Sequence, residues 1–246
     1  MLGKTKVKYI QSLGQKKQRD AEGLFIAEGP KIVAEFLESR HLEVKQVYAL
    51  SSWLDQYGAL PAGTEAIAVS DDELAKLSQL ATSNQVLAVV KQRPDPVIDP
   101  KGALSLALDT IQDPGNMGTI IRIADWFGIS QLVCSMDCVD VYHPRVVQST
   151  MGSLARVNVL YTGLADWLGA HRDIRVYAAV LEGQDVTAMA KLREGVILIG
   201  NESRGISPEV MALANVRVTI PRKGAAESLN AAVATGILLS HLVSFT

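Results

Sequence analysis

Short apolar runs alternate with amphipathic stretches along most of this chain. After residue 100 the apolar runs are β-branched or leucine-rich and nearly continuous, which predicts strands that are buried on both faces. The expected strands are 103–110, 131–135, 175–181, 196–200 and 216–220, separated by expected helices at 117–127, 144–152, 163–171, 208–214 and 228–246. This alternation predicts an α/β fold built on a mostly parallel sheet.

A smaller set of alternating elements precedes residue 93. Helices are expected at 30–39 and at 71–80, where Ser70 is a good N-cap, and strands at 44–50, 65–69 and 86–91. Pro94, Pro96 and Pro100 then exclude both a helix and a central strand. We therefore predict a small α/β domain at 1–92, a proline-rich linker at 93–100 and a larger domain at 101–246.

Composition narrows the class of protein. Of 246 residues, 48% are hydrophobic and 20% are charged, as in ordinary globular proteins. The two cysteines form only a C-x-x-x-C pair and the four histidines are far apart, so neither a disulfide scaffold nor a metal site is expected. No apolar segment follows the first residues, which favours the cytoplasm. The uncharged stretch 228–246 is interrupted by polar and small residues, which favours a buried helix over a membrane span.

The charge is unevenly distributed around a net value of −2. The first nineteen residues contain six basic side chains and no acidic one: Lys4, Lys6, Lys8, Lys16, Lys17 and Arg19. A basic segment of this kind suits an arm that contacts nucleic-acid phosphates. A solvated, partly frayed terminus explains the charge equally well.

Three loops at predicted strand ends carry more polar and glycine residues than a turn needs. In the first, 109–122, Asn116 is expected to cap the following helix, and Arg122 lies off that helix's buried face. A capping asparagine and a solvated arginine would explain this loop without any function. Ligands of parallel α/β sheets bind beyond the carboxyl ends of the strands, so the three loops together predict a binding cleft.

The second loop follows the strand at 196–200, where Glu202 lies between Gly200 and Gly205. Glycines there permit a close approach of the backbone to a ligand, although Glu202 could instead pair with Arg204. The third loop, 221–230, ends at Ser228 and Asn230. Ser228 is expected to cap the C-terminal helix, which leaves Asn230 in a helical first turn that asparagine does not favour.

The three loops carry recognisable motifs. The pattern N-x-G-x-x-x-R (116–122), the loop L-I-G-N-E-x-x-G (198–205) and the segment I-P-x-x-G-x-x-x-S-L-N (220–230) resemble, in order and spacing, the motifs of the TrmH/SpoU family of SPOUT methyltransferases. The resemblance spans 101–246. The segment 25–37, with Glu28 before a glycine, looks like the start of the substrate-binding domain of rRNA-type members, and 143–154 is similar to a helix of the family.

The resemblance implies an S-adenosylmethionine-dependent RNA methyltransferase that acts on a ribose 2′-hydroxyl, with rRNA favoured as the substrate. It implies a trefoil knot in the C-terminal domain, a homodimer formed through that domain, and an RNA-binding N-terminal domain that includes Glu28. By the same resemblance, the catalytic residues are Arg122, Asn116, Glu202, Ser228 and Asn230. The cofactor-binding residues are Leu181, Gly183, Gly200, Ile220 and Leu229, and no metal or membrane is involved.

Three alternatives stay open at this point. The RNA could be a tRNA, or the protein could bind RNA through its basic segment without catalysing a reaction. A nicotinamide-dependent enzyme with a Rossmann-like fold is less favoured, because the turn at 113–118 lacks the glycine pattern G-x-G-x-x-G.

Overall fold

The computed structural model describes residues 2–244 and contains two compact units. The first unit runs to Pro94 and also includes Asp140–Arg156. The second unit consists of Asp95–Val139 together with the chain from Val157 onward. The segment 140–156 therefore lies with the N-terminal part of the protein, although it interrupts the sequence of the second unit.

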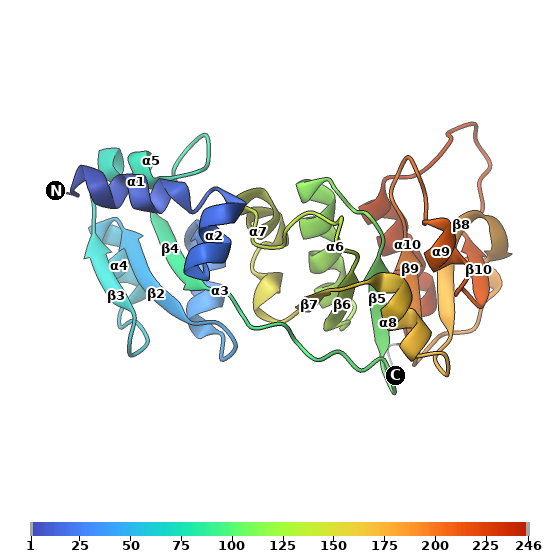
Figure 1. Cartoon of the computed structure of the whole chain (residues 1–246). Helices are drawn as coiled ribbons and strands as arrows, with labels where there is room; N and C mark the ends of the chain where they lie inside the picture. The colour runs from blue at the N-terminus through green and yellow to red at the C-terminus, as the bar shows by residue number, and fades with distance from the viewer. Residues whose placement is uncertain (1, 245–246) are drawn as a thin grey trace. The chain divides into compact units, whose positions relative to one another are not determined.

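The first unit is built on a four-stranded sheet (Figure 1), whose strand order is β1-β4-β2-β3. Its strands are β1 (Leu24–Glu28), β2 (Val44–Ala49), β3 (Glu65–Ala68) and β4 (Val86–Lys91). Its helices are α1 (Lys4–Ser12), α2 (Lys16–Glu22), α3 (Pro30–Glu38), α4 (Ser51–Tyr57), α5 (Asp71–Leu77) and α7 (Pro144–Thr150), followed by the 3-10 turn η1 (Ser153–Ala155).

Both faces of this sheet are buried. On one face, apolar side chains of α1 and α5, such as Ile10 and Leu77, pack against Ile26 and Leu87 of the strands. On the other face, the ring of Phe25 contacts Phe36 of α3 and Tyr142 of the inserted segment, with ring centres 6.0 and 4.6 Å apart. The inserted segment thus supplies part of the core of the first unit.

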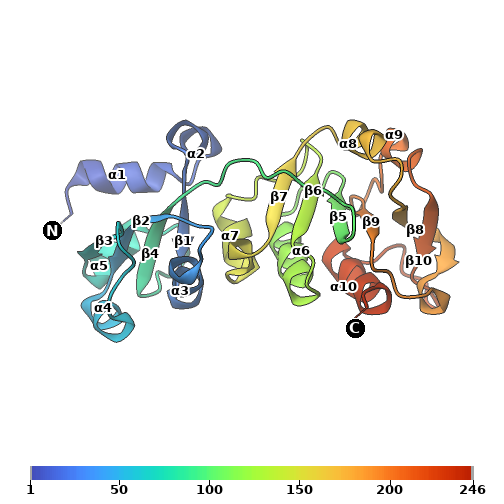
Figure 2. The ribbon, with the colours of Figure 1, turned by 90° about the horizontal axis from the view of Figure 1, so that it is seen from below.

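The second unit contains a six-stranded sheet in the order β10-β8-β9-β5-β6-β7, and all its neighbouring strands are parallel. Figure 2 shows α6 and α10 on one side of this sheet and α8 and α9 on the other. The strands are β5 (Leu104–Leu108), β6 (Gln131–Cys134), β7 (Asn158–Tyr161), β8 (Val176–Asp185), β9 (Gly195–Ile199) and β10 (Val216–Thr219). The helices are α6 (Pro114–Trp126), α8 (Leu164–Ala170), the 3-10 turn η2 (Val186–Ala188), α9 (Pro208–Met211) and α10 (Ala231–Leu242).

The α/β fold with a parallel sheet confirms the predicted fold class, and the main strands lie where the apolar runs placed them. The predicted capping role of Ser70 is confirmed, since its side chain and Glu73 form a reciprocal capping box. The prediction missed β1, β7, α4 and the helical structure of the basic segment, which forms α1 and α2. These elements are short and weakly periodic, so tertiary packing decides them.

Residues 92–100 carry no regular secondary structure, which agrees with their three prolines. The domain boundaries and the trefoil knot stay predictions. Within residues 2–244, no helix has the length and apolar character needed to cross a membrane.

Candidate active site

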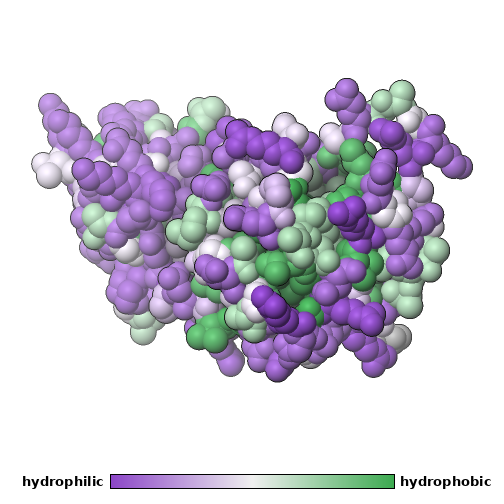
Figure 3. Space-filling model, turned by 45° about the vertical axis from the view of Figure 1, so that its right-hand side comes forward, coloured by the Kyte–Doolittle hydropathy of each residue, from purple (hydrophilic) through white to green (hydrophobic). Residues whose placement is uncertain are grey.

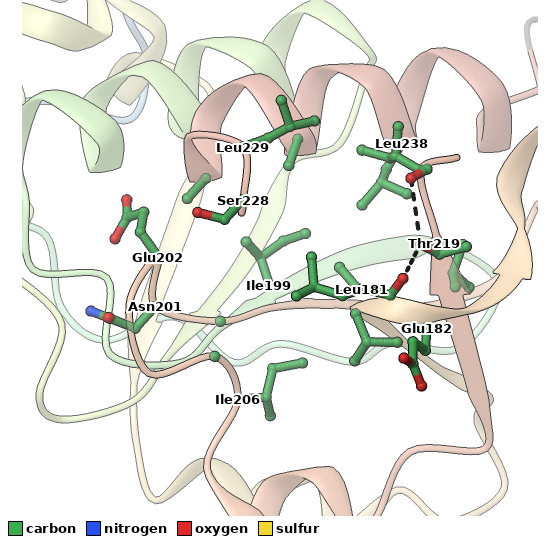
Figure 4. Close-up of a pocket in the computed structure, with 18 of the residues that line it drawn as sticks. Leu181, Glu182, Ile199, Asn201, Glu202, Ile206, Thr219, Ser228, Leu229 and Leu238 are labelled. Carbon is green, nitrogen blue, oxygen red and sulfur yellow. Dashed lines mark hydrogen bonds between the residues drawn. The ribbon is translucent and has the colours of Figure 1, made fainter. Parts of the chain in front are cut away.

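A cavity of about 780 Å³ opens at the carboxyl ends of β8, β9 and β10. Figure 4 shows the side chains of Leu181, Ile199 and Ile206 around it, with Leu229 and Leu238 on the side of α10. Leu181 is 70% exposed and Leu229 is 45% exposed, so both present apolar surface to the open cavity instead of to the core. An apolar cavity with polar groups at one end is the usual form of a small-molecule site.

Four of the five predicted cofactor-binding residues line this cavity, namely Leu181, Gly200, Ile220 and Leu229. Gly183 is absent from the lining within the described chain. It lies in β8 against β10, where an added Cβ would be 2.6 Å from the carbonyl oxygen of Arg217. Close packing of two strands therefore explains this glycine without any contact to a ligand.

Gly200 permits a similarly close approach within the site itself. A Cβ at this position would be 2.4 Å from the carbonyl carbon of Gly205, a distance that no side chain tolerates. The chain can therefore leave β9 and fold back on itself, and the backbones of Asn201 and Gly205 exchange two hydrogen bonds of 2.9 Å. The resulting tight loop carries Glu202 at the cavity wall (Figure 4).

Three of the predicted catalytic side chains form one hydrogen-bonded chain. The Nδ2 group of Asn116 donates to Oε1 of Glu202, and Nδ2 of Asn230 donates to Oδ1 of Asn116 at 2.8 Å. These contacts join positions that are 86 and 114 residues apart in the sequence. The structure thus brings the first, second and third motifs together at one end of the cavity.

The residues that cap α6 and α10 differ from the predicted ones. This difference makes the hydrogen bonds among Asn116, Glu202 and Asn230 possible. Asp113, not Asn116, caps α6 by accepting from the Asn116 backbone N–H at 2.8 Å. Asn230, not Ser228, caps α10 through Oδ1, which accepts from the N–H groups of Ala232 and Val233. The side chain of Asn116 is therefore available to Glu202, and Asn230 offers its amide to Asn116 while it caps α10.

The remaining two predicted catalytic residues are not part of the hydrogen-bonded chain of side chains. Ser228 lines the cavity beside Leu229 (Figure 4). Arg122 projects from α6 as an exposed side chain, and its guanidinium forms no ion pair or hydrogen bond with any part of the chain that the structure describes. An unpaired guanidinium can still bind a phosphate with two parallel hydrogen bonds.

Two buried thiols support the loop that begins at Asp109. The Sγ atom of Cys138 accepts from the Ile111 backbone N–H at 3.2 Å. Its hydrogen bond with Cys134 is the main cause that lowers the pKa of Cys138, and the same contact, together with burial, raises the pKa of Cys134. Both side chains are buried, so they brace the loop and are not exposed as nucleophiles.

The residues predicted to contact RNA fall into two groups in the first unit. Lys4, Lys8, Lys16 and Lys17 are exposed on α1 and α2, and Lys6 is partly buried, with Nζ 3.1 Å from Oε1 of Gln46. The view in Figure 3 shows a largely hydrophilic surface on this unit, whereas hydrophobic side chains gather on the second unit. The exposed lysines are therefore accessible to a polyanion.

Arg19 and Glu28 do not share this surface position, because both are buried. The guanidinium of Arg19 is 1% exposed and pairs with Asp140 at 2.6 Å. The carboxylate of Glu28 accepts from the Ser78 hydroxyl and, at 2.8 Å, from the Gln79 N–H, and burial raises its pKa. Both side chains hold the first unit together, which is a structural role that the sequence pattern did not indicate.

The sequence prediction missed other residues of the cavity wall, notably Ile206, Thr219 and Leu238. Thr219 donates through Oγ1 to the Leu181 carbonyl at 2.9 Å and so joins β10 to β8 (Figure 4). These side chains look like ordinary core residues in the sequence. Among residues 2–244, no three His, Cys, Asp or Glu side chains are grouped so that they could hold a metal ion.

Comparison with known proteins agrees with this geometry. The model described as the SpoU rRNA Methylase family matches residues 103–240, and the MRM3-like substrate binding domain matches residues 4–88. The 23S rRNA (guanosine(2553)-2′-O)-methyltransferase RlmP of Bacillus subtilis is 28% identical over 96% of this chain and 95% of its own length.

Two solved structures also resemble the whole chain. An AdoMet-bound rRNA methyltransferase from Sinorhizobium meliloti has a TM-score of 0.87 and 31% identity, covering 98% of this chain and 95% of that one. The SpoU methyltransferase AviRb from Streptomyces viridochromogenes, in complex with AdoMet, has a TM-score of 0.83 and 29% identity, covering 97% of each chain. Because the family match at 103–240 spans more than half of the sequence and contains all three motif loops, this chain belongs to the SpoU rRNA methylase family.

Proposed function

We propose that this protein transfers a methyl group from S-adenosylmethionine to a ribose 2′-hydroxyl of ribosomal RNA. The observation that carries this proposal is the apolar cavity with the Asn116–Glu202–Asn230 chain at its end. The likeness to 23S rRNA methyltransferases over both units favours rRNA over tRNA as the substrate.

The cavity fits the methyl donor. S-adenosylmethionine has an apolar adenine face, which suits the leucine and isoleucine walls around Leu181 and Leu229, and a charged methionine end, which suits the polar residues that also line the cavity. Gly200 and Gly205 line the cavity with backbone alone, because neither has a side chain. When bound there, the cofactor supplies an electrophilic methyl group on a sulfonium.

The side chains at the end of the cavity are suited to positioning the ribose. We assign Arg122 to a phosphate of the RNA and to the negative charge that develops on the 2′-oxygen as the S–CH3 bond breaks, the O–CH3 bond forms and the hydroxyl proton passes to water. Asn116, Glu202, Asn230 and Ser228 order the ribose, and such positioning is a large part of the catalysis of a two-substrate reaction.

The decisive experiment uses tritium-labelled S-adenosylmethionine with transcripts of 23S rRNA, 16S rRNA and tRNA. We expect label in rRNA, and we expect it in dinucleotides that resist alkaline hydrolysis, because a 2′-O-methyl group blocks cleavage of the neighbouring phosphodiester. Label in tRNA alone would support the tRNA alternative. Binding of cofactor and RNA without transfer would support a non-catalytic RNA-binding protein.

The first unit is proposed to hold the RNA through the exposed lysines of α1 and α2. Replacing Lys4 and Lys8 with Gln should weaken binding and reduce the slope of log affinity against log salt by about 0.7 for each lost contact with a single-stranded phosphate. Lys76→Gln on α5 is a matched control, since it removes a lysine of the same unit outside α1 and α2. An unchanged salt slope in the double variant would contradict this assignment.

We also propose a homodimer formed through the second unit. Trp126 of α6 is 83% exposed and Val233 of α10 is 52% exposed, on the two helices that cover the same side of the sheet (Figure 2). Exposed aromatic and aliphatic surface of this kind favours association. Sedimentation velocity should find a dimer that Trp126→Lys dissociates, whereas Val97→Lys, at a 98% exposed linker position, should leave it intact.

A further inference from the structure

The hydrogen-bonded chain at the cavity depends on a loop, 200–207, that must hold Glu202 in one place. Within this loop Asn201 makes more contacts than its neighbours. Its Oδ1 accepts from the backbone N–H of Ser203 at 2.9 Å and of Arg204 at 3.1 Å. Its Nδ2 donates to the carbonyl oxygen of Thr110 at 2.9 Å. One side chain therefore shapes the loop internally and attaches it to the end of β5.

Thr110 is the unusual partner in this contact, because it has a φ of 59°. A β-branched residue rarely adopts positive φ, and such strain persists only where the surroundings hold it. Here the Thr110 N–H donates to the Ser135 hydroxyl at 2.9 Å, and the Thr110 hydroxyl donates to Asp109 at 3.1 Å. Together with the bond from Asn201, these contacts occupy the backbone N–H, the hydroxyl and the carbonyl of Thr110 and hold it in this conformation.

A second bond joins the same two segments. The carboxylate of Asp109 is 4% exposed, and its Oδ2 accepts from the Ser207 N–H at 2.7 Å. Asp109 and Thr110, which follow β5, thus form hydrogen bonds with both ends of the loop that carries Glu202. The same segment after β5 continues into α6, whose first turn carries Asn116, the partner of Glu202.

We propose that Asn201 is a positioning residue for methyl transfer, acting through Glu202 by locking the 200–207 loop onto Thr110. The contact sets the distance between the loop and the start of α6, and therefore the hydrogen bond between Glu202 and Asn116. Asn201 lines the cavity, but its side-chain amide is bonded to Thr110, Ser203 and Arg204, so in this scheme it acts through Glu202. The inference rests on the proposed function, and it adds a residue whose amide donor is essential for geometry.

The sharpest test is Asn201→Asp, which keeps the acceptor for Ser203 and Arg204 and removes the donor to Thr110. We expect kcat to fall about 10- to 100-fold, as small misplacements of reacting groups do, with KM for S-adenosylmethionine within about twofold. Asn215→Asp is the matched control. Asn215 is an exposed position whose Oδ1 accepts from Val176 N–H at 2.7 Å and whose side-chain Nδ2 group donates to no described residue.

A double-mutant cycle distinguishes action through Glu202 from a separate role. In a Glu202→Ala background, Asn201→Asp should change kcat less than about twofold, because its partner in the scheme is already gone. A further tenfold loss there, or normal kcat for Asn201→Asp alone, would overturn the proposal.

Hydrogen exchange tests, without an activity assay, whether the Asn201 side chain holds the 200–207 loop in place. Asn201→Ala should speed exchange of the amides in 200–207 at least tenfold while the strands keep their protection, whereas Asn201→Asp should retain protection at Ser203 and Arg204. Unchanged exchange in Asn201→Ala would overturn the proposal that Asn201 holds this loop. A wild-type protein without transfer would refute the proposed function, whereas wild-type transfer beside an unaffected Asn201→Asp variant refutes only the inference about Asn201.

Discussion

The buried ion pair between Arg19 and Asp140 allows a quantitative prediction. The guanidinium of Arg19 is 1% exposed and donates to Asp140 Oδ2 at 2.6 and 3.2 Å, and to the carbonyls of Leu13 and Gly14 at 3.1 and 2.8 Å. The other carboxylate oxygen of Asp140 accepts from the Tyr142 N–H at 3.0 Å. Asp140→Asn can keep Oδ1 as the acceptor for Tyr142, but its NH2 group then replaces Oδ2, so the variant removes both the charge and the acceptor for Arg19.

Removing that charge leaves a buried guanidinium without a counterion. Breaking a buried pair in this way typically costs about 3–5 kcal/mol. We expect Asp140→Asn to destabilise the first unit by this amount, and Arg19→Met to have a similar effect. The double variant should lose less than the two single losses together, by about 1–3 kcal/mol, because the two side chains interact directly.

Urea unfolding followed by the fluorescence of Trp53 is the appropriate assay. Trp53 is 5% exposed in the first unit, and replacing Trp126 and Trp167 with Phe removes the signals of the second unit. A local probe is needed because two units do not necessarily unfold in one transition.

The exposed pair between Lys16 and Asp20 provides the control, since its side chains are 65% and 52% exposed. Asp20→Asn should cost less than about 1 kcal/mol. A loss of that small size in Asp140→Asn would refute the reasoning, because it would mean that the buried pair behaves as a surface pair.

Three further predictions concern the site and the first unit. Arg122→Ala should keep S-adenosylmethionine binding in calorimetry but lower methyl transfer at least about 100-fold, and near-normal turnover would contradict its role. Gly200→Ala should weaken cofactor binding more than about tenfold, because the new Cβ would meet Gly205 at 2.4 Å; Gly224→Ala, which meets nothing within 4 Å, should bind normally. Burial raises the pKa of Glu28 above its ordinary 4.5, so the folded state holds its proton more tightly than the unfolded state. Its contribution to stability is therefore full below pH 4.5 and is lost as pH rises through the raised pKa, and Glu28→Gln should flatten this decline in unfolding curves measured from pH 4.5 to 7. Parallel curves for Glu28→Gln and wild type would show that the carboxyl does not control this dependence.

The local elements of this protein are largely written in its sequence. Apolar runs such as 196–200 predict β9 because a strand buried on both faces needs apolar side chains at every position. The capping box that begins at Ser70 is also local, since its two partners are three residues apart. The motif loops could be located for the same reason, because glycine, proline and polar residues cluster at the ends of strands.

The partners of the site residues were decided only by the tertiary structure. Sequence spacing assigned Asn116 and Ser228 to helix caps, whereas the fold gives those caps to Asp113 and Asn230. Several nearby side chains can cap the same helix. Which one does so depends on the residue at which the helix begins. The contact of Asn116 with Glu202 joins positions 86 residues apart, which no local pattern encodes.

The difference between local pattern and tertiary packing also explains why the basic side chains of the N-terminal segment differ in burial. Its charge suggested an arm for phosphates, and four of its lysines are exposed, but Arg19 lies in the core beside Asp140, 121 residues away. Charge is a property of the residue, whereas burial depends on what packs over it, and here the covering segment is 140–156 from the middle of the second unit's sequence. The sequence by itself determines the long apolar strands and the positions of the motif loops. Long-range packing decides the short, weakly periodic elements and which distant side chains meet, because a pairwise contact between distant positions is set by the whole fold.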